Sequence, residues 1–307
     1  MRRIWLVVVA AALLPAACSK ATPTTAPSTP SPSASPVTAA SCAASATFVK
    51  SGGLTVGTDN PAFPPYFAGG ETKVHKEWKF NDPYTGQGFE DAVAYEVAKR
   101  LGFSQAQVAW VVAPFNQTYK PGAKNYDFAI EQIDYSTQRA QAVDFSDSYY
   151  DKARAVVARK GTPITKATSI SDLKNFKLAS QIGTTDYAFI TNTIMPNKEP
   201  GAYNSLADAV AAMNAHQVDG LVVDLPTALY MADPFVQEVK NSTVVGQFPV
   251  QPGGPYFGMT FQKGNSLVAC VNLALQEMKS DSTLQNITTE WLSQKTNVGT
   301  VPVFSTS

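Results

Sequence analysis

The segment Tyr126-Asp-Phe-Ala-Ile-Glu-Gln-Ile-Asp-Tyr-Ser-Thr-Gln-Arg-Ala-Gln-Ala-Val-Asp-Phe-Ser-Asp-Ser-Tyr-Tyr150 begins with an apolar run and continues as a polar stretch that contains Arg139. Residues 126–130 are apolar enough to form a buried strand. Residues 90–101, which precede it, place apolar side chains on one face of a helix that Gly102 ends. A strand, a helix and a further strand in this order are typical of α/β layers.

The alternation continues along the chain after Gly161-Thr-Pro163, where a second set of elements begins. This pattern predicts an α/β fold with mainly parallel sheets. Strands are expected at residues 54–58, 108–113, 154–160, 178–182, 220–223, 244–250 and 256–262. Helices are expected at residues 185–194 and 206–215 and in two amphipathic segments around Leu267–Met278 and Leu284–Trp291.

Three polar positions lie at expected strand ends, which is where open α/β sheets bind ligands. Arg139 offers a fork of donors that matches a carboxylate. Gly183-Thr184-Thr185 follows a strand and opens a helix, which suits an anion. Asp224 is an acceptor suited to an ammonium group. Taken singly, each position has an ordinary alternative. Arg139 could form a surface ion pair, Gly183-Thr-Thr185 could be a plain helix start, and Asp224 could cap a loop.

Together these positions resemble a known family. Gly88-Phe-Glu-Asp-Ala-Val-Ala-Tyr-Glu-Val-Ala-Lys-Arg-Leu-Gly102 looks like the signature of the bacterial extracellular solute-binding proteins of family 3, and residues 126–150 are similar to the next block of that family. Gly183-Thr-Thr185, Asp224 and Pro255-Tyr-Phe-Gly258 follow in the expected order. The resemblance covers roughly residues 50–295.

The resemblance implies a two-lobed periplasmic-binding-protein fold of type II, in which each lobe is a mainly parallel sheet flanked by helices. Residues 50–156 and 252–307 would form lobe 1 and residues 157–251 lobe 2, with two hinge crossings near Val156 and Pro252. The implied function is capture of an amino acid by lobe closure and its delivery to the permease of an ABC importer, without enzymatic activity.

The resemblance also implies roles for individual residues. Arg139 would bind the ligand carboxylate with Thr185, and the helix start at Thr184 would assist. Asp224 would hold the α-amino group, and Asp59 an end of the ligand side chain. Phe63 and Phe115 would sandwich that side chain, although both could equally be core residues.

The chain departs from its relatives in the cleft strand, where Glu131, Gln132 and Asp134 replace small residues. These acids, if they line the cleft, favour a basic amino acid such as lysine, arginine or ornithine; a neutral polar one such as glutamine is second. Glu131 is as readily placed on the surface. The insertion over residues 69–87 could form a lid. The rival function is a periplasmic enzyme of the same fold that resembles cyclohexadienyl or prephenate dehydratases, with Glu131 as general acid.

The N-terminus reads as an export signal. Arg2 and Arg3 precede an 11-residue apolar run, too short to span a bilayer. Residues 1–17 are therefore expected to be a signal peptide, and Cys18 after Ala-Ala resembles a bacterial lipoprotein cysteine that receives the lipid, such as palmitate. Plain secretion with an unmodified cysteine is the alternative. Residues 18–49, rich in Ser, Thr, Pro and Ala, would form a tether.

Export permits disulfides, and Cys42 could pair with Cys270, although two free thiols are the alternative. The mature protein would lie on the outer face of the cell membrane, held there only by the lipid, as a monomer. Equal numbers of basic and acidic residues, 24 each, argue against a nucleic-acid partner. Two distant histidines, His75 and His216, argue against a zinc site, and no cofactor is expected.

Overall fold

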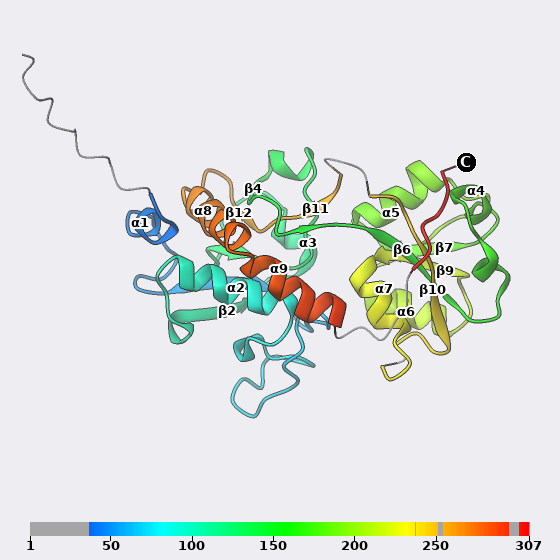
Figure 1. Cartoon of the computed structure of the whole chain (residues 1–307), viewed down its shortest axis with the longest axis horizontal. Coiled ribbons are helices and arrows are strands. Elements are labelled where there is room, and N and C mark those ends of the chain that lie inside the picture. The colour runs from blue at the N-terminus through cyan, green and yellow to red at the C-terminus, as the bar shows by residue number, and fades with distance from the viewer. Residues whose placement is uncertain (1–36, 237, 251–253, 295–300, 307) are drawn as a thin grey trace, which may run out of the picture. The chain divides into compact units, whose positions relative to one another are not determined.

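Two five-stranded sheets, each with its own hydrophobic core, organise the chain (Figure 1). The computed structural model describes residues 37–236, 238–250, 254–294 and 301–306. The expected signal peptide, Cys18, most of the tether and Pro252 lie outside these residues. The expected α/β class is confirmed. The sheets are mixed rather than mainly parallel, because each contains both parallel and antiparallel pairs.

The first sheet has the order β2-β1-β3-β12-β4. Strand β1, which lies between β2 and β3, is buried along its whole length, as its run of Leu, Val and Thr predicts. We call this sheet and the helices packed on it the first lobe. Its strands are β1 (Leu54–Thr58), β2 (Val108–Val112), β3 (Phe128–Ala129), β4 (Val143–Phe145) and β12 (Thr260–Gln262). Its helices are α1 (Ala39–Ala43), α2 (Phe89–Arg100), α3 (Phe115–Thr118), α8 (Leu267–Ser280) and α9 (Thr283–Thr288), with short helical turns at Pro83–Thr85, Gln105–Gln107, Arg139–Gln141 and Thr289–Gln294.

The second sheet has the order β10-β6-β9-β7-β8, and with its helices it forms the second lobe. Its strands are β6 (Arg154–Arg159), β7 (Leu178–Gln181), β8 (Gly201–Tyr203), β9 (Gly220–Asp224) and β10 (Ser242–Gln247). Its helices are α4 (Ile170–Leu173), α5 (Thr185–Phe189), α6 (Leu206–Asn214) and α7 (Leu225–Ala232), with turns at Pro163–Lys166 and Ile190–Ile194. The helix expected over residues 185–194 is thus an α-helix that continues as a π-helical turn.

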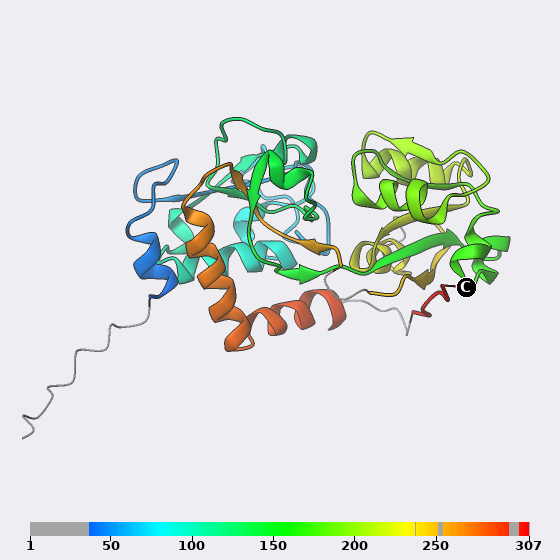
Figure 2. The ribbon, with the colours of Figure 1, turned by 90° about the horizontal axis from the view of Figure 1, so that it is seen from above.

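The connection between the lobes lies earlier than expected. A short ladder of β5 (Tyr150–Asp151) and β11 (Tyr256–Phe257) precedes the first crossing, and the chain enters the second lobe at β6, which Figure 2 shows in green. Val156, expected at the hinge, is fully buried in the second core.

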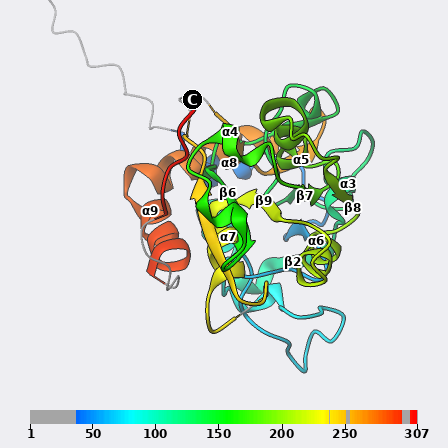
Figure 3. The ribbon, with the colours of Figure 1, turned by 90° about the vertical axis from the view of Figure 1, so that its right-hand side faces the viewer.

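The C-terminal residues also differ from the expectation that all of residues 252–307 belong to the first lobe. Phe304 is buried in the second core, with its ring 5.1 Å from that of Phe248. Val303 pairs with Gln247 and Ser305 with Ser169, beside α4 (Figure 3). The described C-terminal residues, 301–306, therefore belong to the second lobe.

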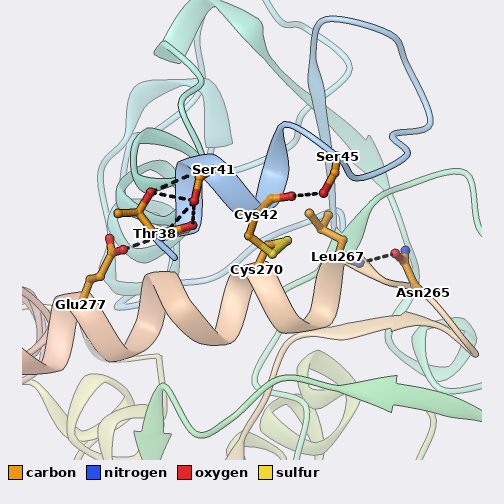
Figure 4. Close-up of a disulfide and its surroundings, with 9 residues drawn as sticks. Thr38, Ser41, Cys42, Ser45, Asn265, Leu267, Cys270 and Glu277 are labelled. Carbon is orange, nitrogen blue, oxygen red and sulfur yellow. Dashed lines mark hydrogen bonds between the residues drawn. A yellow bond between two sulfur atoms is a disulfide. The ribbon is translucent and has the colours of Figure 1, made fainter. Parts of the chain in front are cut away.

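The expected tether ends earlier than residue 49, because α1 forms within it. Thr38 caps this helix, and the backbone N–H of Ala39 donates to Glu277 of α8 at 3.0 Å (Figure 4). Cys42 and Cys270 form a disulfide with their Cα atoms 5.3 Å apart, which fixes α1 to α8. Ala39 and Ala43 of α1 are buried in this contact. An alanine-rich composition, which indicated a tether, is therefore also compatible with a helix packed closely against another. Within the described residues, no helix is both long and apolar enough to cross a membrane.

Candidate functional site

A cavity of about 370 Å³ is lined by residues of both lobes. It lies where strands β1 and β9 end and where the chain leaves β3, the edge at which ligands bind in open α/β sheets. The first lobe contributes Thr58, Asp59, Asn60, Pro61, Ala62, Phe63, Phe67, Phe115, Glu131, Gln132, Asp134 and Phe257, with Lys152 from the crossing. The second lobe contributes Ser180, Gln181, Thr184, Asp186, Ser205, Leu206, Ala207, Val223, Asp224 and Thr227.

Asp224 is the acid that the second lobe presents at the end of β9. It caps α7, accepting from the backbone N–H of Thr227 at 2.9 Å and from the Thr227 hydroxyl at 2.8 Å. The Tyr66 hydroxyl of the first lobe also donates to it. Burial raises the pKa of Asp224 and, with the neighbouring carboxylate, that of Tyr66. Asp224 is therefore both the loop cap and a cavity residue, which the sequence offered as alternatives.

Glu131 and Asp59 form the acidic wall of the first lobe. Glu131 is 6% exposed, and its Oε2 has no hydrogen-bond partner. Burial raises the pKa of Glu131 well above its ordinary value, and the adjacent Asp59 raises it further. Glu131 is thus in the cavity wall and not on the surface, the other position that the sequence allowed.

Glu90, a buried acid of α2, contacts the residue that follows Glu131 in the wall. Glu90 accepts from the backbone N–H of Gln132 at 2.6 Å, from the Gln132 side-chain amide and from the Tyr149 hydroxyl. These contacts keep Gln132 in a left-handed conformation, with φ of 46°. Burial raises the pKa of Glu90 to about 7, although its three donors oppose that shift.

Lys152, on the first crossing, joins acids of the two lobes. Its ammonium lies 2.7 Å from Asp134 of the first lobe and 2.8 Å from Asp186 of the second. Arg154 also pairs with Asp186, at 2.7 Å, and donates to the Thr185 hydroxyl, which donates to Asp134. Burial lowers the pKa of Lys152, but the two carboxylates more than offset this and leave it raised.

The structure does not place Arg139 in the cavity wall. Its guanidinium donates to the carbonyl oxygens of Asp134, at 2.8 Å, and of Gly183 in the second lobe, at 2.9 Å. Its Cζ also lies 4.2 Å from the ring centre of Tyr119 and 5.5 Å from that of Phe115. Burial lowers the pKa of Arg139, although the nearby Asp134 carboxylate opposes that shift. The guanidinium is therefore used as a bridge between the lobes.

The threonines expected to help it are also engaged with protein groups. Thr184 lines the cavity, but its hydroxyl caps Tyr187 N–H of α5 and donates to the Gln181 carbonyl at 2.6 Å. Thr185 is not among the cavity residues, and its hydroxyl joins Arg154 to Asp134. Of the ten ligand-binding residues expected from the sequence, the cavity thus gathers eight and omits Arg139 and Thr185.

The insertion over residues 69–87 supports the cavity from outside. Its Phe80 ring lies 5.5 Å from that of Phe63, a wall residue. Asn60 donates to the carbonyl of Glu77 at 2.7 Å, and the amide of Asn81 donates to the Ala62 carbonyl at 2.9 Å. No residue of the insertion, all of which the structure describes, lines the cavity. The insertion therefore packs against residues of the cavity wall from outside and does not form the expected lid.

The comparison with protein families agrees with this arrangement. Residues 54–294 match the model of the bacterial extracellular solute-binding proteins, family 3. The chain belongs to this family.

Relatives of this family 3 protein include amino-acid-binding proteins. The L-cystine-binding protein TcyA of Bacillus subtilis (strain 168) is 31% identical over 81% of the chain and 84% of the relative. The ABC transporter glutamine-binding protein GlnH of the same organism is 26% identical over 69% and 76%. An ancestral arginine-binding protein bound to arginine is similar in structure, with a TM-score of 0.63, 27% identity and coverage of 79% of this chain and 99% of that chain.

The cavity of this family 3 protein is strongly acidic. Among the described residues, five carboxylates line it against one lysine. Such a surface attracts cations and disfavours a net anion. In the part of the chain that the structure describes, no group of three or more His, Cys, Asp or Glu side chains is arranged to hold a metal ion.

Sequence reasoning missed Lys152, Asp186 and Tyr66. The signal for Lys152 was present, because a lysine immediately before an apolar strand needs a partner. Asp186 follows the threonine pair directly and could have been read with it. Tyr66 had no signal, since its role depends on Asp224, which is 158 residues away.

Proposed function

We propose that this chain is the extracytoplasmic binding component of an ABC importer and that it captures an amino acid with a cationic side chain. The observation that carries the proposal is the composition of the cavity wall, in which five Asp and Glu side chains stand against one lysine. The relatives named above for amino acids support the substrate class. Lysine, arginine and ornithine fit this wall better than glutamine, and better than an acidic amino acid.

The two lobes supply complementary acids. Asp224 of the second lobe would take the α-ammonium, and Asp59 with Glu131 of the first would take the cationic end of the side chain. Because a buried ion needs partners that offset its lost hydration, a ligand is fully paired only when both lobes contact it. Ligand binding then favours the closed arrangement over the open one, through differential affinity. The permease would recognise that closed form.

Isothermal titration calorimetry of the purified protein against a panel of amino acids tests this proposal. Lysine, arginine or ornithine should bind most tightly, with glutamine and cystine weaker and glutamate without measurable binding. Tight glutamate binding would contradict the charge argument. Small-angle scattering with and without the bound amino acid checks the closure.

A second candidate function is catalysis in the same cleft, in the manner of a dehydratase. Glu131 favours it, because a buried carboxyl with a raised pKa is the kind of group that acts as a general acid. Asp224 opposes it, since an acid at that position suits a ligand with an amino group, which prephenate lacks. Incubation of the protein with prephenate separates the two, because only the enzyme would release a product.

We also propose that Cys18 carries the lipid that anchors the protein and that the chain works as a monomer. The anchor is tested by metabolic labelling with palmitate, which a Cys18→Ala variant should not incorporate. Released variant in the medium, with unchanged amino-acid affinity, would fit an anchor that plays no part in binding.

A further inference from the structure

A tyrosine of the first lobe contacts Asp224, the acid of the second lobe that is proposed for the ligand ammonium. Asp224 is the last residue of β9 and lines the cavity. Tyr66 belongs to the core of the first lobe, is 1% exposed, and donates from its hydroxyl to Oδ1 of Asp224. Because the donor and the acceptor belong to different lobes, this hydrogen bond exists only while the two lobes lie together.

The position of the Tyr66 hydroxyl is fixed by its own lobe. The backbone N–H groups of Glu90 and Asp91, in the first turn of α2, donate to the Tyr66 carbonyl at 3.1 Å and 3.3 Å. The ring centre of Tyr66 lies 6.4 Å from that of Phe89 and 6.3 Å from that of Phe257, and both pairs meet edge to face. The backbone and the ring are thus both held, so the hydroxyl stays directed at the same carboxylate.

The donors that surround Asp224 leave one of its oxygens for a ligand. Its Oδ1 accepts from the backbone N–H of Thr227 and from the Tyr66 hydroxyl, and its Oδ2 accepts from the Thr227 hydroxyl. A carboxylate offers about four acceptor positions, so the open one lies on Oδ2. Burial raises the pKa of Asp224, and the hydrogen bond from Tyr66 opposes that shift by favouring the ionised form.

We propose that Tyr66 is a positioning residue for amino-acid recognition, because its hydroxyl orients the Asp224 carboxylate so that Oδ2 receives the α-ammonium of the ligand. The inference rests on the proposed function, since it concerns the same acid. It adds a residue that does not itself line the cavity. The hydroxyl supplies this role and the ring supplies packing, so the two can be separated by substitution.

Tyr66→Phe removes the donor and keeps the ring. Calorimetric titrations compare each amino acid with the compound that lacks only its α-amino group: lysine with 6-aminohexanoate, and arginine with 5-guanidinopentanoate. We expect Tyr66→Phe to bind the amino acid about tenfold or more weakly than the wild type does, as for the loss of a hydrogen bond to a charged group. The affinity for the deaminated compound should change by less than about threefold, because that ligand brings no ammonium to Asp224. A purely structural role would weaken both ligands by the same factor.

Tyr95→Phe is the matched control, because it removes a tyrosine hydroxyl from the same lobe. The Tyr95 hydroxyl accepts from Nε1 of Trp110 at 3.1 Å, and neither residue lines the cavity. The affinities for both ligands of a pair should therefore stay within about twofold of the wild type in this variant.

A second measurement tests the contact without any ligand. Denaturant titrations of the wild type, Tyr66→Phe, Asp224→Asn and the double variant give the coupling between the two side chains. The double variant should lose less stability than the sum of the two single losses. Additive losses would overturn the inference, even where a deaminated compound does not bind.

The titrations also separate the inference from the proposed function. Equal weakening of the amino acid and its deaminated form in Tyr66→Phe would overturn the positioning role and leave the proposed function intact. Tighter binding of the amino acid by this variant would do the same, because the hydroxyl would then compete with the ligand for Asp224. Failure of the wild type to bind any basic amino acid would overturn both.

Discussion

The two groups of buried acids in the cleft are balanced to different degrees. Asp134 and Asp186 share Lys152, and Arg154 adds a second cation beside Asp186. Among the residues that the structure describes, no cation pairs with Asp59 or Glu131, and Glu131 keeps an oxygen without a hydrogen-bond partner. The first group links the two lobes, whereas the second has no counterion and is the one that we propose for the ligand. The two groups thus differ in their counterions and not in their burial.

Removal of the counterion should have the largest effect. Lys152→Met leaves Asp134 and Asp186 buried without their shared lysine, and we expect a loss of about 3–5 kcal/mol in the free energy of unfolding. Denaturant titration measures it. The matched control is Lys263→Met, because Lys263 pairs with Asp144 at the same 2.7 Å but is half exposed. That change should cost only about 0–1 kcal/mol. Equal losses of unfolding free energy in the two variants would contradict the view that the buried Lys152 stabilises the fold more than an exposed lysine does.

Asp224, which we propose as the ligand-binding acid of the second lobe, should have the next largest effect. Asp224→Asn removes the charge expected to hold the ammonium, and we expect the affinity to fall by about 2–5 kcal/mol, or about thirtyfold or more. Calorimetry with the tightest-binding amino acid measures this. Asp219→Asn, beside the exposed Lys198 in the same lobe, should leave the affinity unchanged. Full retention of affinity by Asp224→Asn would remove this residue from the site.

The acidic wall formed by Glu131 and Asp59 should also make ligand binding depend on pH. Burial and Asp59 raise the pKa of Glu131, so this carboxyl keeps its proton in the empty cleft at a pH where an ordinary glutamate is ionised. A cationic ligand binds the ionised form and must displace that proton. The affinity should therefore fall as the pH falls below the raised pKa, by up to about tenfold per pH unit for one proton. Glu90 also raises the pKa of Glu131, and burial raises the pKa of Glu90 itself to about 7.

Dissociation constants for lysine between pH 6 and 8.5 check this dependence, because lysine keeps its side-chain charge over that range. Glu131→Gln should flatten the slope, and Glu90→Gln serves as the control for the acid behind the wall. An identical slope in the wild type and in Glu131→Gln would assign the proton to another group.

The sequence predicted the elements of the fold more completely than the contacts between them. Apolar periodicity placed α2, β6 and α6 to within one residue at each end, because core burial dictates these patterns. The contact of Arg139 with the Gly183 carbonyl could not be foreseen, since a backbone acceptor has no signature in the side chains. The same holds for Lys152, whose partners are 18 and 34 residues away along the chain and come together only when the lobes do.

The smallest effect is expected at Phe63, a cavity residue that the insertion contacts from outside. Phe80 is 45% exposed and contacts Phe63 with its ring. An aromatic pair contributes about 0.5–1.5 kcal/mol beyond burial, so Phe80→Ala should weaken ligand binding by about two- to tenfold through a less fixed Phe63. Val74→Ala is the control, because Val74 lies in the same insertion and is 80% exposed. If Phe80→Ala and Val74→Ala bind the amino acid equally well, the insertion does not act on the cleft through this ring. A loss confined to Phe80→Ala would show that Phe63, unlike the Lys152 group, depends on support from a segment outside the cavity.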